Sequence, residues 1–328
     1  HAPFNTLVWN TCVNVHIRGV YCMQMITRHE RAGVVWVDLE SPTRDELRAV
    51  VEEFSIDSQV EEEIIAPTPY PLFVASPEYA YLILHFPTAE ISGGARNQEI
   101  DIIVGKNFLV TARYEVVGTI LSLHKAFEAE ELLGIPNDGG APVLLERLLR
   151  RLYSSMGEET ERVARSLERI EQDIFSGTER KTVRAISEAG RILLRFETTL
   201  TRHTEALTAF LEELQTTAFF GKKFAKQASR IEAERSHAAS LVISFRAVAR
   251  ELRTTNDSLL SSSQNEVMKV FTFMSVAFLP LTLIAALFGM HAKHAPILGH
   301  ENDFWIIILF MLAIELLLVL YMRLKKWI

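Results

Sequence analysis

The sequence predicts an α+β membrane protein, with a soluble part of roughly 260 residues followed by two membrane-spanning helices. From Val270 to Met290, 21 residues carry no charge, and from Phe304 to Met322, 19 residues carry only Glu315. A helix needs about 20 apolar residues to cross a bilayer. Ahead of these stretches, strand and helix signals alternate over the first third of the chain, and only helical periodicity follows.

Composition removes several classes of protein. Charged residues make up 23% and apolar residues 48% of the 328, so the chain is neither disordered nor fibrous. The 41 acidic residues outnumber the 34 basic ones, so no basic surplus favours a nucleic-acid partner. The sequence contains no phosphate-binding loop, nucleophile elbow or Cys-His metal framework. We therefore expect neither an enzyme nor a covalently bound cofactor.

The first 24 residues stand apart from the rest. They contain both cysteines, Cys12 and Cys22, and no charged segment followed by an apolar one that would indicate a signal peptide. Periodic patterning begins near Met25. We expect residues 1–24 to be a non-native extension.

Residues 25–142 are predicted to form a cytoplasmic α/β domain. Strands are expected at 33–39 and 78–86, and a hairpin with strands at 99–104 and 108–114 is indicated by the Gly105-Lys106-Asn107 turn. The segment Ser41-Pro42-Thr43 is expected to open a helix with Pro42 at its first position.

Residues 143–269 are predicted to form a cytoplasmic stalk of helices, with a break at Ser176-Gly177. No proline interrupts the chain after Gly221 until Pro280, so one helix of about 100 Å from Lys222 to Met290 is plausible. A helix of this length needs neighbours against which to bury an apolar seam. The seam is expected at Ile231, Ala238, Leu241, Phe245, Val248, Leu252 and Leu259.

The two spans, 270–290 and 304–322, are joined by an outer loop at 291–303 and followed by a basic tail at 323–328. Basic residues flank the spans on one side, and the loop carries Glu301 and Asp303, which could attract cations. The positive-inside rule then places both termini in the cytoplasm of a multi-pass inner-membrane protein. The basic flanking residues are Lys269, Arg323, Lys325 and Lys326.

A seam of small and polar residues runs along the first span at steps of three and four. In a lipid-facing helix such residues would avoid one seam, whereas in a bundle they face inward. The seam indicates either ordinary packing through small residues or a narrow pore with apolar constrictions at Met268 and Leu279. Its members are Asn265, Met268, Thr272, Ser275, Leu279, Thr282, Ala286 and Gly289.

The sequence resembles the CorA family of magnesium channels at four places. These are Gly289-Met290-His291 after the first span, Asn265–Val270 at the membrane entry, Phe278–Thr282 within the span, and Lys325-Lys326-Trp327 at the end. The resemblance implies a homopentameric funnel in which the first span lines a central pore. It also implies that Gly289, Met290 and His291 form the outer mouth, and that Mg²⁺ is the transported ion.

Two departures from the family bear on the ion and on its sensing. The family motif ends in Asn where this chain has His291, and imidazole suits Zn²⁺, Co²⁺ or Ni²⁺ better than Mg²⁺. His291 and His294 could meet on one helical turn as metal ligands. Arg230 falls at or near a position where the family carries an acidic residue that senses Mg²⁺.

Glu315 lies inside the second span, where an ionisable side chain is costly unless it is protonated, paired or turned toward a neighbouring helix. It is either a proton-coupled or inter-helix polar contact, or a protonated carboxyl buried against the first span. The leading hypothesis is a channel for hydrated Mg²⁺. The alternatives are a zinc, cobalt or nickel transporter that uses His291, and a non-conducting CorA-like scaffold that regulates another membrane protein.

Overall fold

The computed structural model describes residues 25–31, 33–87, 97–133, 139–176, 179–289 and 302–324. The expected extension at 1–24 lies outside these ranges, as do most of the predicted outer loop and of the basic tail. The chain divides into two units, His1–Arg253 and Thr254–Ile328. The long helix α6 (Ala225–Gly289) runs from the first unit into the second.

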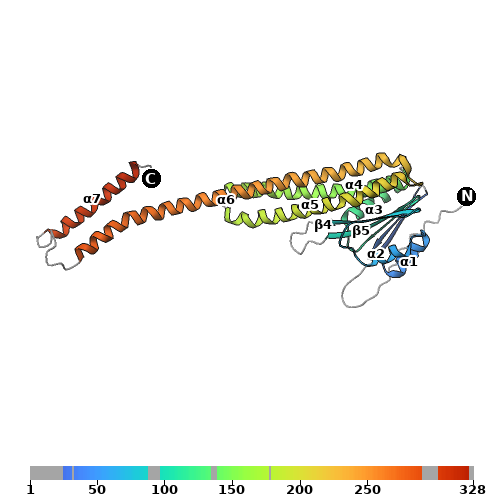
Figure 1. The fold of residues 1–328 in the computed structure, drawn as a ribbon, viewed down its shortest axis with the longest axis horizontal. Helices are drawn as coiled ribbons and strands as arrows, with labels where there is room; N and C mark the ends of the chain where they lie inside the picture. Colours follow the sequence, from blue (N-terminus) through green and yellow to red (C-terminus); the bar gives the residue numbers. More distant parts are fainter. Residues whose placement is uncertain are drawn as a thin grey trace. The chain divides into compact units, whose positions relative to one another are not determined.

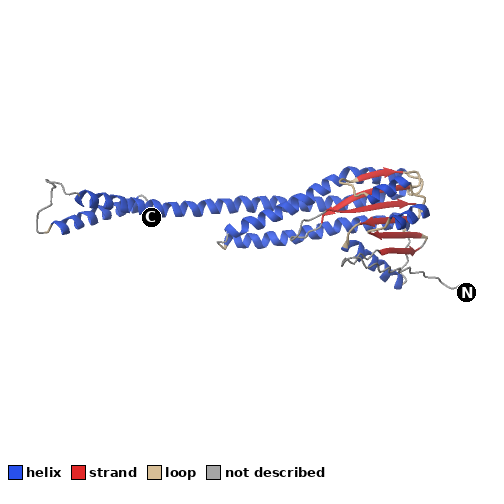
Figure 2. Cartoon of the chain, turned by 90° about the horizontal axis from the view of Figure 1, so that it is seen from below, coloured by secondary structure: helices blue, strands red, loops and turns tan. Residues whose placement is uncertain are grey.

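A six-stranded mixed sheet forms the base of the first unit. Its strand order is β1-β2-β6-β5-β4-β3, and only the β2–β6 pair is parallel. The strands and their helices appear in Figures 1 and 2. The strands are β1 (Met25–Arg31), β2 (Val34–Glu40), β3 (Leu72–Ala75), β4 (Tyr79–Pro87), β5 (Asn97–Gly105) and β6 (Phe108–Arg113).

Helices cover both faces of the sheet. On one face, α1 (Arg44–Glu53) and α2 (Ser58–Ile65) pack on a core that includes Leu39, Ile83 and Val110. On the other face lie α3 (Gly118–Leu132), α4 (Gly140–Phe175) and α5 (Glu179–Thr216). Every residue of β4 is buried, as expected for a central strand covered on both sides.

The strands predicted from periodicity are confirmed as β2, β4, β5 and β6, including the β5–β6 hairpin. The edge strands β1 and β3 and the helices α2 and α3 were not predicted. Pro42 was wrongly placed inside α1. The helix begins at Arg44, and Thr43 is its N-cap in a reciprocal capping box with Glu46, so the proline precedes the helix.

The helices α4 and α5 and the first part of α6 pack together in the first unit, and a short 3₁₀ helix (Gly221–Phe224) leads into α6. The predicted seam was wrong at two positions. Val242 and Ala249 are buried where Leu241 and Val248 were expected, and Val248 is 42% exposed. The buried positions follow a strict heptad spacing, so at these two turns the buried residue is one position later than predicted. They are Ala228, Ile231, Ala238, Val242, Ala249, Leu252 and Asn256.

Among the described residues, the second unit contains the rest of α6 and the helix α7 (Asp303–Leu324). Two helical segments, Gly221–Gly289 and Phe304–Leu324, are long and apolar enough to cross a membrane. The first of these segments contains Pro280, and the helix continues past it because the backbone hydrogen bonds of the neighbouring turns remain in place. The single long helix expected from the sequence is therefore present from Ala225, three residues later than predicted.

Candidate functional site

All eight residues of the predicted seam are exposed along α6 in the single chain. The exposed fraction is 61% for Met268 and 67% for Leu279. Exposed apolar side chains on a helix of this hydropathy require lipid or another protein surface around them. The seam is therefore free to face other copies of the chain.

The seam hydroxyls are bonded to their own helix. Thr272, Ser275 and Thr282 each donate to the carbonyl four residues earlier, at 2.8, 2.9 and 2.7 Å. A hydroxyl that donates in this way keeps its oxygen lone pairs for an outside donor, such as a water molecule. The seam thus offers a row of hydrogen-bond acceptors without a carboxylate.

A different face of α6 is partly covered. In α7 the partly covered residues also form one stripe, which includes Glu315 and ends at the buried Met322. No residue of the seam belongs to either stripe. On α6 the covered residues are Phe273, Val276, Ala277, Pro280, Leu281, Ile284 and Phe288.

The outer-mouth residues are only partly described. Gly289 is the last residue of α6, and the space around its Cα is open, while Asp303 is the first residue of α7. Met290, His291, His294 and Glu301 lie outside the described residues. Within the described ranges, no group of three His, Cys, Asp or Glu side chains could hold a metal ion.

Arg230 forms part of an ionic cluster in the first unit. Its guanidinium lies 3.2 Å from Oε1 of Glu146, a carboxylate on α4 that is only 5% exposed. Arg150 contacts the same oxygen at 3.4 Å and Glu234 at 3.5 Å. A fixed cation therefore already neutralises Glu146 at this position.

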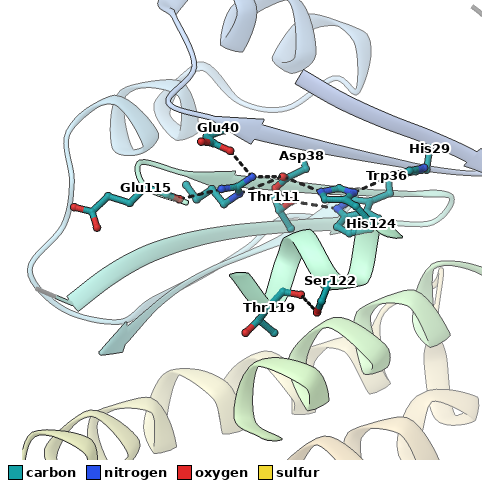
Figure 3. A network of polar contacts seen from close by, with 10 residues as sticks. His29, Trp36, Asp38, Glu40, Thr111, Glu115, Thr119, Ser122 and His124 are labelled. Atoms are coloured by element: carbon teal, nitrogen blue, oxygen red, sulfur yellow. Dashed lines mark hydrogen bonds and ion pairs between the residues drawn. The ribbon is translucent and has the colours of Figure 1, made fainter. Parts of the chain in front are cut away.

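Sequence reasoning did not identify a buried polar network at the centre of the sheet, shown in Figure 3. The carboxylate of Asp38 on β2 accepts from Thr111 at 2.5 Å, from Arg113 at 3.1 and 3.2 Å, and from His124 at 3.0 Å. Asp38 and Arg113 are 1% and 2% exposed. The only sequence signal was a charged residue within an otherwise apolar strand, because the partners lie 73 to 86 residues away.

The network continues to the sheet edge through two histidines. Nδ1 of His124 lies 2.8 Å from Nε2 of His29 on β1, and the ring of Trp36 stacks on His124 with centroids 4.1 Å apart. Since His124 donates through Nε2 to Asp38, its Nδ1 accepts the proton of His29 in the neutral state. Burial alone would raise the pKa of Asp38, but the hydrogen bond from His124 and the charge of Arg113 outweigh it and lower that pKa.

The same domain contains a pocket of about 500 Å³ beside the first residues of β5. Two of its lining residues, His85 and Tyr114, have buried polar atoms without a partner, Nδ1 and Oη. Glu99 also lines it, and its carboxylate contacts Nε2 of His85 at 3.4 Å. Burial raises the pKa of Asp101, two residues along β5, whose carboxyl group accepts a hydrogen bond from Tyr81 at 2.6 Å.

The family described as “CorA-like Mg2+ transporter protein” matches residues 31–326 of the chain. The chain belongs to this family. As a CorA-family protein it is a divalent-cation transporter rather than an enzyme, and the end of α6 and α7 are its two C-terminal membrane-spanning helices.

Two curated relatives cover most of this CorA-family chain. The cobalt/magnesium transport protein CorA of Thermotoga maritima is 22% identical over 294 residues, which are 89% of this chain and 83% of that protein. The protein of the same name from Methanocaldococcus jannaschii is 21% identical over 301 residues, which are 90% and 92% of the two chains.

The fold also matches a solved structure. The complete structure of the CorA magnesium transporter from M. jannaschii has a TM-score of 0.79 and 19% identity, and it covers 90% of this chain and 92% of that one. The polar seam therefore lies in a CorA-family fold that is similar over nearly its whole length.

Proposed function

We propose that the chain assembles into a homopentameric channel that carries divalent cations, above all Mg²⁺, across the inner membrane. In this assembly the five α6 helices line the pore with the seam from Asn265 to Gly289. The observation that carries the proposal is that the whole seam is exposed and belongs to a different face of α6 from the partly covered one. A polar seam that the chain's own second span does not cover is best satisfied at a symmetric helix bundle.

The chemistry of the seam suits a hydrated ion. Mg²⁺ dehydrates reluctantly and usually keeps several water molecules, whose hydrogens point outward. The oxygens of Thr272, Ser275 and Thr282 can accept these hydrogens, because their own protons are already donated to the helix backbone. Met268 and Leu279 then form apolar constrictions between the polar rings.

Transport in this proposal is driven by the membrane potential. No nucleotide-binding motif is present in the sequence. With both termini in the cytoplasm, the ion enters past the outer mouth at Gly289, Met290 and His291. Moving one elementary charge is worth about 2.3 kcal/mol per 100 mV, and a divalent ion gains about twice as much.

His291 favours zinc, cobalt or nickel as a second candidate cargo. Five such side chains around an outer mouth would offer imidazole nitrogen, which first-row transition metals prefer. His294 would add a second ring, and Glu301 and Asp303 would raise the local cation concentration. Both curated relatives described above are named as cobalt/magnesium transport proteins.

Cysteine accessibility in proteoliposomes tests the pore. After replacement of Cys12 and Cys22 by serine, Thr282→Cys and Ser275→Cys are compared with Met274→Cys, which is 50% exposed on a face outside the seam. A charged thiol reagent should block Mg²⁺ uptake in the two seam variants and leave the Met274 variant unaffected. Equal inhibition of all three variants, or of the control alone, would contradict the pore assignment.

Dyes specific for Mg²⁺, Zn²⁺ and Ni²⁺ separate the candidate functions in the same vesicles. Faster Mg²⁺ uptake supports the leading proposal, and faster Zn²⁺ or Ni²⁺ uptake supports the second. No uptake of any of these ions would leave the non-conducting scaffold as the function. Native mass spectrometry should show five copies, and a monomer or dimer as the sole species would refute the pentamer.

A further inference from the structure

Glu315 is the acidic residue between Phe304 and Met322, and one oxygen of its carboxyl group lacks a partner. The residue lies on the partly covered stripe of α7, and its Oε2 atom is buried without a hydrogen-bond donor. The described part of the two spans contains no basic side chain between Val270 and Met322. An ionised carboxylate without a countercharge in this position would be very costly, whereas a neutral acid needs only an acceptor for its proton.

The first span provides such an acceptor at Pro280. Proline has no backbone N–H, so the carbonyl of Val276, four residues earlier, loses its helical donor. In a bilayer no water replaces that donor, and an unsatisfied backbone group costs several kcal/mol. Both Val276 and Pro280 lie on the partly covered stripe of α6.

The two groups are at similar distances from the outer ends of their helices. Glu315 is twelve residues after Asp303, the first residue of α7, which corresponds to about 18 Å along the axis. Val276 is thirteen residues before Gly289, the last residue of α6, or about 20 Å. Consecutive spans cross a membrane in opposite directions, so packing of the two partly covered stripes against each other would bring the proton donor and the orphan acceptor together near its middle.

We propose that Glu315 spans the gap as the neutral acid and donates its hydroxyl proton to the carbonyl of Val276. Pro280 and Glu315 are then a matched pair, in which one creates the free acceptor and the other satisfies it. Because α6 lines the pore in the function proposed above, Glu315 is a positioning residue that fixes the pore helix against α7.

Infrared spectroscopy of the full chain in lipid nanodiscs tests the bond without any transport measurement. The difference between wild type and Glu315→Gln should show a carboxylic acid band that belongs to Glu315. In Pro280→Ala the new backbone N–H occupies the Val276 carbonyl, so this band should move to higher frequency as the acid loses its acceptor. Leu316→Ala, on the lipid-facing side and 71% exposed, should leave the band unchanged.

The absence of an acid band, or a band that Pro280→Ala does not shift, would overturn the proposal. The first result would mean an ionised Glu315, and the second would mean that water or another copy of the chain provides the acceptor. Both outcomes are independent of whether the protein conducts ions. Absence of flux in the wild type would therefore refute the proposed function and leave the bond to be decided by the spectrum.

A double-mutant cycle on Mg²⁺ flux then tests the positioning role. Glu315→Leu should lower flux about threefold, the factor that corresponds to an average interhelical hydrogen bond of about 0.6 kcal/mol in a membrane. Glu315→Gln should retain most of the flux because its amide N–H can still donate. In the Pro280→Ala background Glu315→Leu should have no further effect, and an equal loss in both backgrounds would contradict the pairing.

Discussion

Removing the carboxylate of Asp38 should destabilise the α/β domain far more than removing an exposed one. In Asp38→Ala the hydroxyl of Thr111, two N–H groups of Arg113 and the Nε2–H of His124 lose their acceptor inside the sheet. Breaking a buried ion pair by removing one partner typically costs about 3–5 kcal/mol. Glu40 remains 2.7 Å from Arg113 and retains part of the compensation, so we expect the lower end, about 3 kcal/mol.

Hydrogen–deuterium exchange on the full-length protein measures this loss. A decrease of about 3 kcal/mol in the opening free energy should speed exchange of the most protected β2 and β6 amides about 150-fold. The matched control is Glu53→Ala, which removes the exposed pair with Arg28 on the same domain. An exposed pair contributes at most about 1 kcal/mol, so its loss should speed exchange about fivefold or less.

The comparison can fail in a defined way. If Asp38→Ala speeds exchange no more than Glu53→Ala does, the network contributes no more than a surface ion pair. Asp38→Asn preserves the shape and one acceptor oxygen, and it should fall between the two. If amides of Asp38→Asn exchange faster than those of Asp38→Ala, the shape of the site, rather than its charge, has been misjudged.

Three further predictions concern protonation and metal response. Burial lowers the pKa of His203 to about 3, so on acidification this imidazole binds a proton in the unfolded state before it does so in the folded state. The free energy of unfolding should therefore fall by about 5 kcal/mol between pH 6.5 and pH 3. Thermal unfolding of His203→Gln should show a flatter pH dependence. Arg230 already neutralises Glu146, so millimolar Mg²⁺ should barely change protease protection of the first unit; strong protection in the wild type would show that other carboxylates sense the ion. Uptake of divalent cations should fall as external pH drops from about 7.5 to 5.5, because protonated His291 rings repel the ion. His291→Asn should remove this pH dependence. The same pH profile in that variant would place His291 outside the ion path.

Periodicity alone determined much of the helical architecture. One run without charge and one that contains only Glu315 define two apolar segments, and steps of three and four along α6 single out its polar seam. These features are local, because each depends on residues within a few turns of one helix. The strands β4, β5 and β6 were predicted for the same reason, since their apolar runs and the Gly105 turn lie next to one another in the chain.

Patterns with weak or competing local signals were predicted less well. The edge strand β3 has only four residues and partly exposed side chains, so it produces little alternation. In the stalk, Leu241 and Val248 are as apolar as the buried Val242, and sequence spacing could not choose between neighbouring positions. The choice depends on which side of α6 meets α4 and α5, a property of the packed helices.

What the sequence by itself determined about this protein is its inner strands, its long helices, its two apolar spans and its family resemblance. The tertiary structure decided which distant groups meet. Asp38 and Arg113 are 75 residues apart and come together because β2 and β6 pair in parallel register, which puts Thr111 opposite Asp38. Local propensity acts over a few residues, whereas a buried charge is stabilised by whatever the whole fold brings within hydrogen-bonding distance.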